Sequence, residues 1–205
     1  MTLSAGVVRR IGVFGGAFDP PHLGHFVLAQ TAIAQLQLES LHIVPTGTAL
    51  HKTRTLSGAE HRLAMAALAF GELPQAHIDP RETQRVGPSF TVDTLTELSQ
   101  ENPQAQLYLI LGQDQAQALP TWHRWQVLFQ LAIICVAGRA DDSGVTATFS
   151  INSVPRDRCI QLAMQSVPLS ATQIRQNVTG HQSISALVND SVARYIASHH
   201  LYLVA

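Results

Sequence analysis

Short continuous apolar runs alternate along this chain with longer stretches in which apolar residues recur every three or four positions. Continuous runs of this length indicate buried strands, and the second pattern indicates helices with one apolar face. The predicted strands are 11–14, 41–45, 76–79, 106–112, 131–139 and 159–164. The predicted helices are 25–38, 59–70, 91–100, a helix after Pro120 that carries Trp122 and Trp125, 170–178 and 189–200.

The segments between these elements are predicted to be loops. Residues 46–58 and 81–89 are polar, and residues 140–158 read as an exposed connection. Hydroxyl groups of Ser89 and Thr91 are placed to cap the helix over 91–100.

Strands that alternate with helices, and that are apolar throughout, indicate a sheet covered on both faces. The predicted fold class is therefore α/β, with a doubly wound, mostly parallel, Rossmann-like sheet. Ligands bind such sheets beyond the carboxyl ends of the strands. Gly15–His25, Gly112–Asp114 and the loop after Pro45 each follow a strand, so we expect them to meet at one crevice. The 205 residues fit a single domain, 1–205, with a helical C-terminal part from about 166 to 205.

Composition narrows the class of protein. The chain is 46% hydrophobic, which is typical of a globular protein rather than a disordered one. Thirteen basic residues against 14 acidic ones give a formal net charge of −1, which does not favour a nucleic-acid-binding surface. A few local cations would still suffice to hold a small anionic ligand.

The cysteines and the apolar runs indicate the cellular compartment of the protein. Cys135 lies in an apolar run and forms no CxxC pair with Cys159, which favours buried thiols in a reducing compartment. The N-terminus is interrupted by Arg9 and Arg10 and lacks the apolar core of a signal peptide. No apolar run reaches the length of about 18 residues that spans a membrane. We therefore expect a cytoplasmic protein.

The stretch FGGAFDPPHLGH, residues 14–25, holds the most distinctive chemistry. It follows a predicted strand and opens a predicted helix, where glycines permit close backbone approach and the helix N-terminus favours anions. The spacing matches neither GxGxxG nor GxxxxGK[ST]. His22 and His25 are three residues apart, so both imidazoles can donate hydrogen bonds to one phosphate. A metal pair with Asp19, or two surface histidines of no special role, are the alternatives.

Two motifs in order carry a family resemblance. GGAFDPPHLGH resembles the GGTFDPxHxGH motif of the HxGH nucleotidyltransferase superfamily, and LSATQIR, residues 169–175, is similar to its ISSTxIR motif. Ala17, Leu169 and Ala171 depart from the family pattern, and Ala17 lacks the usual threonine hydroxyl.

Further segments resemble the bacterial nicotinate-nucleotide adenylyltransferases within that superfamily. They are HK at 51–52, RETQRVGPSFTVDTL at 81–95, LILGQDQAQALPTWHRW at 109–125 and VARYIASHHLY at 192–202. The resemblance covers nearly the whole chain and is weakest over 140–165.

The resemblance implies transfer of AMP from ATP, carried as its Mg²⁺ complex, to nicotinic acid mononucleotide, with release of pyrophosphate. It implies an in-line attack with no covalent enzyme intermediate and no metal held by the protein alone. His22, His25 and Arg175 take the catalytic roles. The implied ATP site is Gly15, Gly16, Ala17, Phe18, His22, His25, Gly112, Asp114, Ser170, Thr172 and Arg175. The implied nicotinate-nucleotide site is His51, Lys52, Phe90, Thr91, Trp122 and His123.

Three rival functions stay open. A pantetheine-phosphate adenylyltransferase or a cytidylyltransferase would share the first motif, although the GQD and PTWHRW segments favour nicotinate. A non-catalytic nucleotide sensor would not need His22, His25 and Arg175 together. A structural domain without a ligand would leave the glycine-rich loop unexplained. The sequence does not decide the oligomeric state.

Overall fold

A single six-stranded sheet forms the centre of the protein. The computed structural model describes residues 8–47, 56–138, 156–165 and 167–203. All strand pairs among these residues are parallel, in the order β3-β2-β1-β4-β5-β6. The strands are β1 (Arg10–Gly16), β2 (Ser40–Pro45), β3 (Ala76–Ile78), β4 (Gln106–Leu111), β5 (Ala132–Gly138) and β6 (Cys159–Ala163). This order is the doubly wound arrangement, with the switch point between β1 and β4, and it confirms the predicted fold class.

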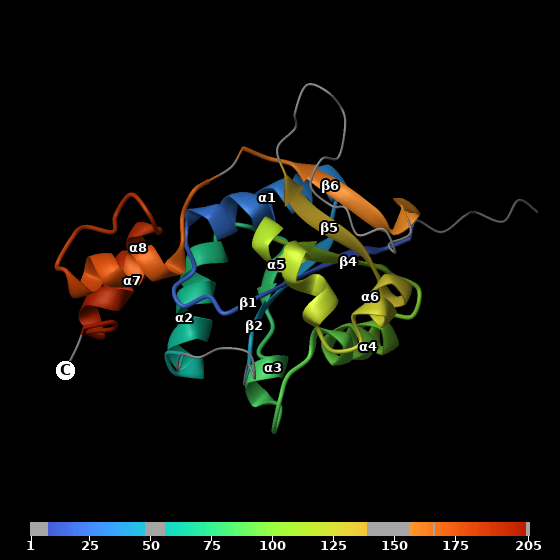
Figure 1. The fold of residues 1–205 in the computed structure, drawn as a ribbon, viewed down its shortest axis with the longest axis horizontal. Coiled ribbons are helices and arrows are strands. Elements are labelled where there is room, and N and C mark those ends of the chain that lie inside the picture. The colour runs from blue at the N-terminus through green and yellow to red at the C-terminus, as the bar shows by residue number, and fades with distance from the viewer. Residues whose placement is uncertain (1–7, 48–55, 139–155, 166, 204–205) are drawn as a thin grey trace, which may run out of the picture.

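Helices cover both faces of the sheet (Figure 1). One face carries α1 (Leu23–Leu36), α2 (Ala59–Phe70), α7 (Ala171–Thr179) and α8 (Asp190–Ser198). The other face carries α4 (Thr91–Glu101), α5 (Gln113–Ala118) and α6 (Trp125–Leu131). The short helix α3 (Arg81–Gln84) and the 3₁₀ turns η1 (Leu119–Thr121) and η2 (Arg156–Arg158) lie in connections.

Strand β4 shows why its apolar run is continuous. Leu107, Leu109 and Leu111 contribute to the core on the α4–α6 face, whereas Tyr108 and Ile110 contribute to the core on the α1–α2 face. Successive side chains of a strand point to opposite faces, so a strand covered on both sides needs apolar residues at every position.

The C-terminal helices share a core with the rest of the domain. Ile174 of α7 and Val192 and Ile196 of α8 are buried in the same cluster as residues of α1 and α2. In Figure 1, α7 and α8 (orange to red) lie at one end of the molecule beside α2. The second motif is therefore brought to the side of the sheet that carries the first.

Three local predictions are wrong. Residues 81–84 form α3 rather than a loop, a helix too short to show periodicity in the sequence. The helix expected to include Trp122 begins only at Trp125, because Trp122 is extended and Arg124 is left-handed with φ 50°. Neither Ser89 nor Thr91 caps α4; the N-cap is Phe90, and the Ser89 hydroxyl donates to the Glu82 carbonyl instead.

None of the helices in the described ranges is long and apolar enough to cross a bilayer.

Candidate active site

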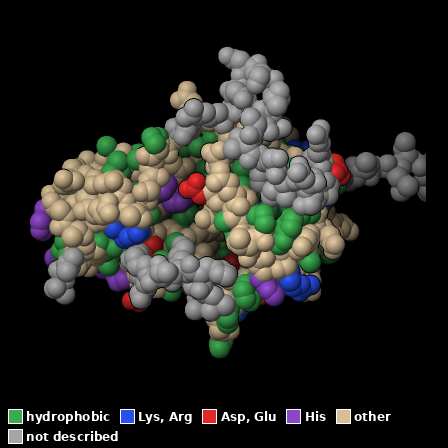
Figure 2. Space-filling model, in the orientation of Figure 1, with side chains coloured by type: hydrophobic (Ala, Val, Ile, Leu, Met, Phe, Trp, Pro, Cys, Tyr) green, Lys and Arg blue, Asp and Glu red, His purple; other side chains and the backbone are tan. Residues whose placement is uncertain are grey.

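A large cleft of about 1400 Å³ opens at the carboxyl ends of β1, β2, β4 and β5. Figure 2 shows the molecule hollowed there, with histidine and acidic side chains at the rim of the hollow. Every predicted site residue that the structure describes lines this cleft. Those residues are Gly15, Gly16, Ala17, Phe18, His22, His25, Phe90, Thr91, Gly112, Asp114, Trp122, His123, Ser170, Thr172 and Arg175. His51 and Lys52 lie outside the described residues.

The glycine-rich loop needs its glycines at two close approaches. A Cβ on Gly16 would lie 3.0 Å from the Phe18 ring, and one on Gly24 would lie 3.1 Å from Nδ1 of His22. Phe18 is buried and left-handed, with φ 46°, and its ring meets His25 edge-on at 5.2 Å. The loop therefore brings backbone and imidazoles to the same wall of the cleft.

His22 and His25 form a stacked pair at the start of α1. Their ring centroids are 3.7 Å apart, and the main-chain N–H of His22 donates to Nδ1 of His25 at 3.1 Å. Burial lowers the pKa of His22 to about 4, so this ring is neutral at pH 7. Its Nδ1 is a buried side-chain atom with no hydrogen-bond partner among the described residues. Two neutral imidazoles can stack this closely, whereas two imidazolium ions would repel each other.

The second motif forms the N-terminus of α7. The Ser170 hydroxyl accepts a hydrogen bond from the main chain of Gln173 and caps the helix. Arg175 donates from Nη1 to the main-chain oxygen of Asp19 at 2.8 Å and from Nη2 to the Thr172 hydroxyl at 3.1 Å. These bonds tie the second motif directly to the first.

Hydrogen bonds of Arg62 and Asp19 join the glycine-rich loop to Thr46 and Ser57, and Arg62 was not among the predicted site residues. Arg62 is 4% exposed and donates to the main-chain oxygens of Ala17, Thr46 and Ser57. Burial lowers its pKa. Asp19 is 1% exposed and accepts from the main-chain N–H of Ser57. An arginine within the apolar helix pattern 59–70 was the available signal for Arg62.

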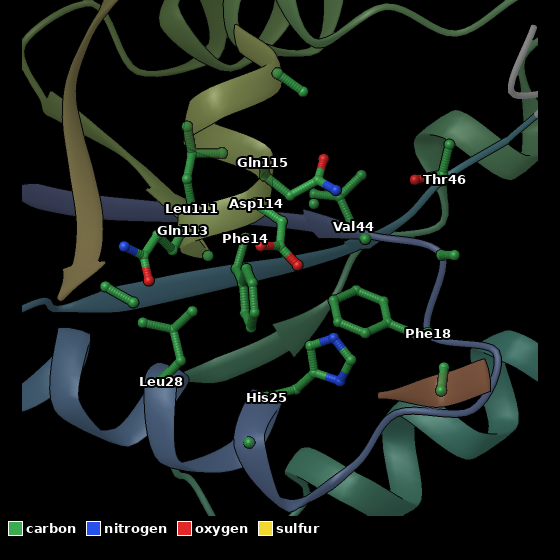
Figure 3. Close-up of a pocket in the computed structure, with 18 of the residues that line it drawn as sticks. Phe14, Phe18, His25, Leu28, Val44, Thr46, Leu111, Gln113, Asp114 and Gln115 are labelled. Atoms are coloured by element: carbon green, nitrogen blue, oxygen red, sulfur yellow. The ribbon is translucent and has the colours of Figure 1, made fainter. Parts of the chain in front are cut away.

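The carboxyl end of β4 and the start of α5 provide the facing wall. Gly112 is the N-cap of α5, and Asp114 lies in the first turn of that helix rather than at its cap. In Figure 3, the side chains of Asp114, Gln113 and Gln115 lie across the cavity from the rings of His25 and Phe18, with Phe14 between them. The two glutamines line the cleft. Both belong to the segment 109–125 that carries the family resemblance, and Gln113 is part of GQD, but neither was predicted as a site residue.

Another part of the cleft lining is formed by Phe90, Thr91, Trp122 and His123. The rings of Phe90 and His123 lie 4.4 Å apart, although the two residues belong to different loops. Thr91 is the first residue of α4, where a helix leaves main-chain N–H groups without intrahelical acceptors, although the Asp93 N–H donates to the Phe90 carbonyl. Trp122 is half-buried against the core and lines the cleft.

A buried carboxylate, Glu82, underlies this region. It is 6% exposed and accepts from the Thr94 hydroxyl at 2.8 Å. Burial raises the pKa of Glu82. The hydrogen bonds from Thr94 and the Gly47 main chain and the positive charge of Arg85 act in the opposite direction. A Cβ on Gly47 would overlap the Glu82 carbonyl oxygen, so the loop that follows β2 packs directly on this segment. Nothing in the sequence around Glu82 marked it as buried.

Metal ligation was the alternative considered for the histidine pair. In the part of the chain that the structure describes, no group of three or more His, Cys, Asp or Glu side chains is arranged to hold a metal ion. The lining instead presents imidazoles, a guanidinium and helix N-termini, which are groups that bind phosphate.

Comparisons with a family model and with individual relatives agree on the family. Residues 13–177 match the cytidylyltransferase-like family. A protein of Albidiferax ferrireducens, named probable nicotinate-nucleotide adenylyltransferase, is 57% identical over 97% of this chain and 100% of its own length. A protein of the same name from Methylibium petroleiphilum is 41% identical over 98% of this chain and 95% of its own.

Solved structures share the fold at low identity. The nicotinic acid mononucleotide adenylyltransferase of Plasmodium falciparum, complexed with APC, superposes with a TM-score of 0.76 at 16% identity, over 95% of this chain and 97% of the other. Its complex with NaAD gives 0.73 at 18% identity, with the same coverage. The fold, the two sequence motifs and the relatives agree, and the chain therefore belongs to the nicotinate-nucleotide adenylyltransferases of the cytidylyltransferase-like family.

Proposed function

We propose that this enzyme transfers AMP from the Mg²⁺ complex of ATP to nicotinic acid mononucleotide. The products are nicotinic acid adenine dinucleotide and pyrophosphate, so the reaction belongs to NAD biosynthesis. One observation carries the proposal: the His22–His25 pair and the Arg175 end of the second motif face the same cleft as Trp122 and the start of α4. Phosphate chemistry and an aromatic acceptor site therefore share one cavity.

The reaction needs no nucleophile from the protein. A 5′-phosphate oxygen of the mononucleotide forms a bond to the α-phosphorus, while the bond from that phosphorus to the oxygen bridging the α- and β-phosphates breaks. Pyrophosphate leaves with the electron pair. Catalysis then depends on alignment and on stabilising charge at the transferred group. Both cysteines are free thiols whose pKa burial raises, Cys135 to about 12 and Cys159 to about 11, which makes them poor nucleophiles.

His25 is the residue we assign to the α-phosphate. Because its Nδ1 accepts the main-chain N–H of His22, the neutral ring carries its proton on Nε2. That N–H donates to a non-bridging oxygen as negative charge grows there. His22, neutral through burial, lines the cleft beside His25 and is assigned to a neighbouring phosphate oxygen.

The start of α7 holds the β- and γ-phosphates. Its first-turn N–H groups favour an anion, and Arg175 adds a fixed positive charge one turn later. Asp114 accepts a hydrogen bond from a ribose hydroxyl of ATP. The magnesium ion enters with the triphosphate, since magnesium in such sites is held largely by substrate phosphates.

The mononucleotide occupies the part of the cleft beside α4. Its pyridine ring stacks on Trp122, and its carboxylate meets the main-chain N–H groups at Thr91 and His123, next to Phe90. His51 and Lys52 bind its phosphate. The free thiols fit a cytoplasmic enzyme.

Pyrophosphate release tests this function. Purified protein with Mg²⁺ and ATP should release pyrophosphate only when nicotinic acid mononucleotide is added. Release with phosphopantetheine and none with the mononucleotide would assign the enzyme to the rival substrate. ATP binding without release in any mixture would leave a nucleotide sensor.

A further inference from the structure

The C-terminal turn of the chain reaches the glycine-rich loop. The Tyr202 hydroxyl donates to Oδ1 of Asp19 at 2.7 Å, although the two residues are 183 positions apart. To make this contact the chain turns sharply after α8, and both His200 and Tyr202 adopt left-handed backbones, with φ 50° and 65°. Such a conformation is unfavourable for a non-glycine residue, so other contacts must hold it.

Two hydrogen bonds hold the turn in place. The Thr179 hydroxyl at the end of α7 donates to the Tyr202 carbonyl at 2.9 Å, and the Leu201 N–H donates to the Ile196 carbonyl at 3.1 Å. The Leu201 and Tyr202 side chains also pack against the core on the α1–α2 face. The Tyr202 hydroxyl is thereby fixed relative to α7, the helix that carries Arg175.

Asp19 links the Tyr202 hydroxyl to the Arg175 guanidinium. Its Oδ1 accepts from Tyr202, its Oδ2 accepts from the Ser57 N–H at 3.2 Å, and its main-chain oxygen accepts from Nη1 of Arg175 at 2.8 Å. The guanidinium is planar and rigid, so two of its N–H groups define the direction of the others. Rotation of the Asp19 peptide would therefore turn the remaining donors of Arg175 away from the triphosphate.

We propose that Tyr202 is a positioning residue for the ATP site, acting through Asp19 to orient Arg175. The inference rests on the proposed function, because it assigns Arg175 to ATP. It predicts an effect confined to ATP, since the Tyr202 hydroxyl donates to Asp19 and Tyr202 is not among the residues that line the cleft. A purely structural tyrosine would alter stability and leave the affinity for each substrate unchanged.

The chain offers a matched control in Tyr195. Its hydroxyl also makes one hydrogen bond from the C-terminal region, to Nδ1 of His61 in α2 at 3.0 Å, but that bond does not reach the cleft. Tyr202→Phe and Tyr195→Phe each remove one hydroxyl and keep the ring. Both should remain folded, which thermal unfolding checks directly.

The test measures kcat, the KM for each substrate, and the Kd for an α,β-methylene analogue of ATP. Tyr202→Phe should lower kcat/KM for ATP and the analogue affinity about tenfold, with the KM for the mononucleotide within about twofold. Tyr195→Phe should match the unmodified enzyme in all of these. Equal effects of the two variants, or equal effects of Tyr202→Phe on both substrates, would overturn the proposal.

A double-mutant cycle tests whether the effect passes through Arg175. In an Arg175→Lys background, Tyr202→Phe should add less than a twofold further loss of analogue affinity, because the oriented guanidinium is already gone. A full tenfold additional loss would show an independent effect and contradict the proposal. The analogue-binding measurements need no acceptor. If unmodified enzyme binds the analogue but transfers no AMP, the proposed function fails, while the Tyr202 proposal is still decided by binding.

Discussion

The main-chain N–H of His22 donates to Nδ1 of His25, and the two rings stack with centroids 3.7 Å apart. One hydrogen bond therefore sets both the orientation and the tautomer of the imidazole assigned to the reacting phosphate. It arises from the sequence spacing itself, because residues three apart at a helix start face the same side. The Nε2–H donor of His25 therefore depends on the three-residue spacing in HLGH and not on either histidine alone.

Replacing His25 should therefore impair chemistry more than folding. His25→Ala removes a preorganised donor to the transferred group, and we expect kcat to fall about 10²–10³-fold. Steady-state pyrophosphate release measures this. His181→Ala is the control, since His181 is exposed in the turn after α7 and outside the cleft. A His25→Ala enzyme within threefold of the unmodified rate would remove His25 from the mechanism.

The buried imidazole of His22 should make stability depend on pH. Its pKa is about 4 in the folded protein and about 6.5 when the chain unfolds, so the unfolded chain binds more protons between these values. This contribution is complete above pH 6.5 and is lost as pH falls towards 4. Denaturant unfolding at several pH values should show a decline in the free energy of unfolding that is weaker in His22→Asn. His77→Asn, at an exposed position of β3, should retain the full decline; identical slopes in all three proteins would show that His22 is not buried as a neutral ring.

The two tryptophans should separate ligand binding from packing. Trp122 lines the cleft, whereas Trp125 meets the Phe129 ring edge-on at 6.0 Å and does not line it. Stacking on an aromatic side chain contributes about 1–3 kcal/mol, so Trp122→Ala should raise the KM for the mononucleotide about tenfold or more and leave the KM for ATP nearly unchanged. Trp125→Ala should lower the melting temperature and spare both KM values. A Trp122→Ala enzyme with equal losses for both substrates would place Trp122 in the core.

The sheet was readily predictable because its strands are covered on both faces. Burial on two sides makes each strand a continuous apolar run, as in 106–112, and the connecting helices carry regular periodicity. Where backbone conformation depends on single residues, the prediction was wrong. Arg124 takes a left-handed backbone and delays the start of α6, and no sequence pattern signals that choice in a non-glycine residue.

The candidate site was also predictable only in part. The residues in contiguous motifs could be predicted, because a loop after a strand places its side chains at the carboxyl edge of the sheet. The contacts that support these residues could not be predicted from the sequence. Asp19 and Tyr202 meet across almost the whole chain, and Arg62 binds three main-chain oxygens from two separate loops. Such partners are defined only once the helices have packed.

Acceptor choice tests the central claim most directly. Nicotinic acid and nicotinamide mononucleotides differ only in the carboxylate that we place at the start of α4, where a charge-assisted hydrogen bond contributes about 1.5–3 kcal/mol and the helix terminus adds to it. With Mg²⁺ and ATP held constant, kcat/KM should be about a hundredfold greater for the acid than for the amide. Equal values, or a preference for the amide, would contradict the account.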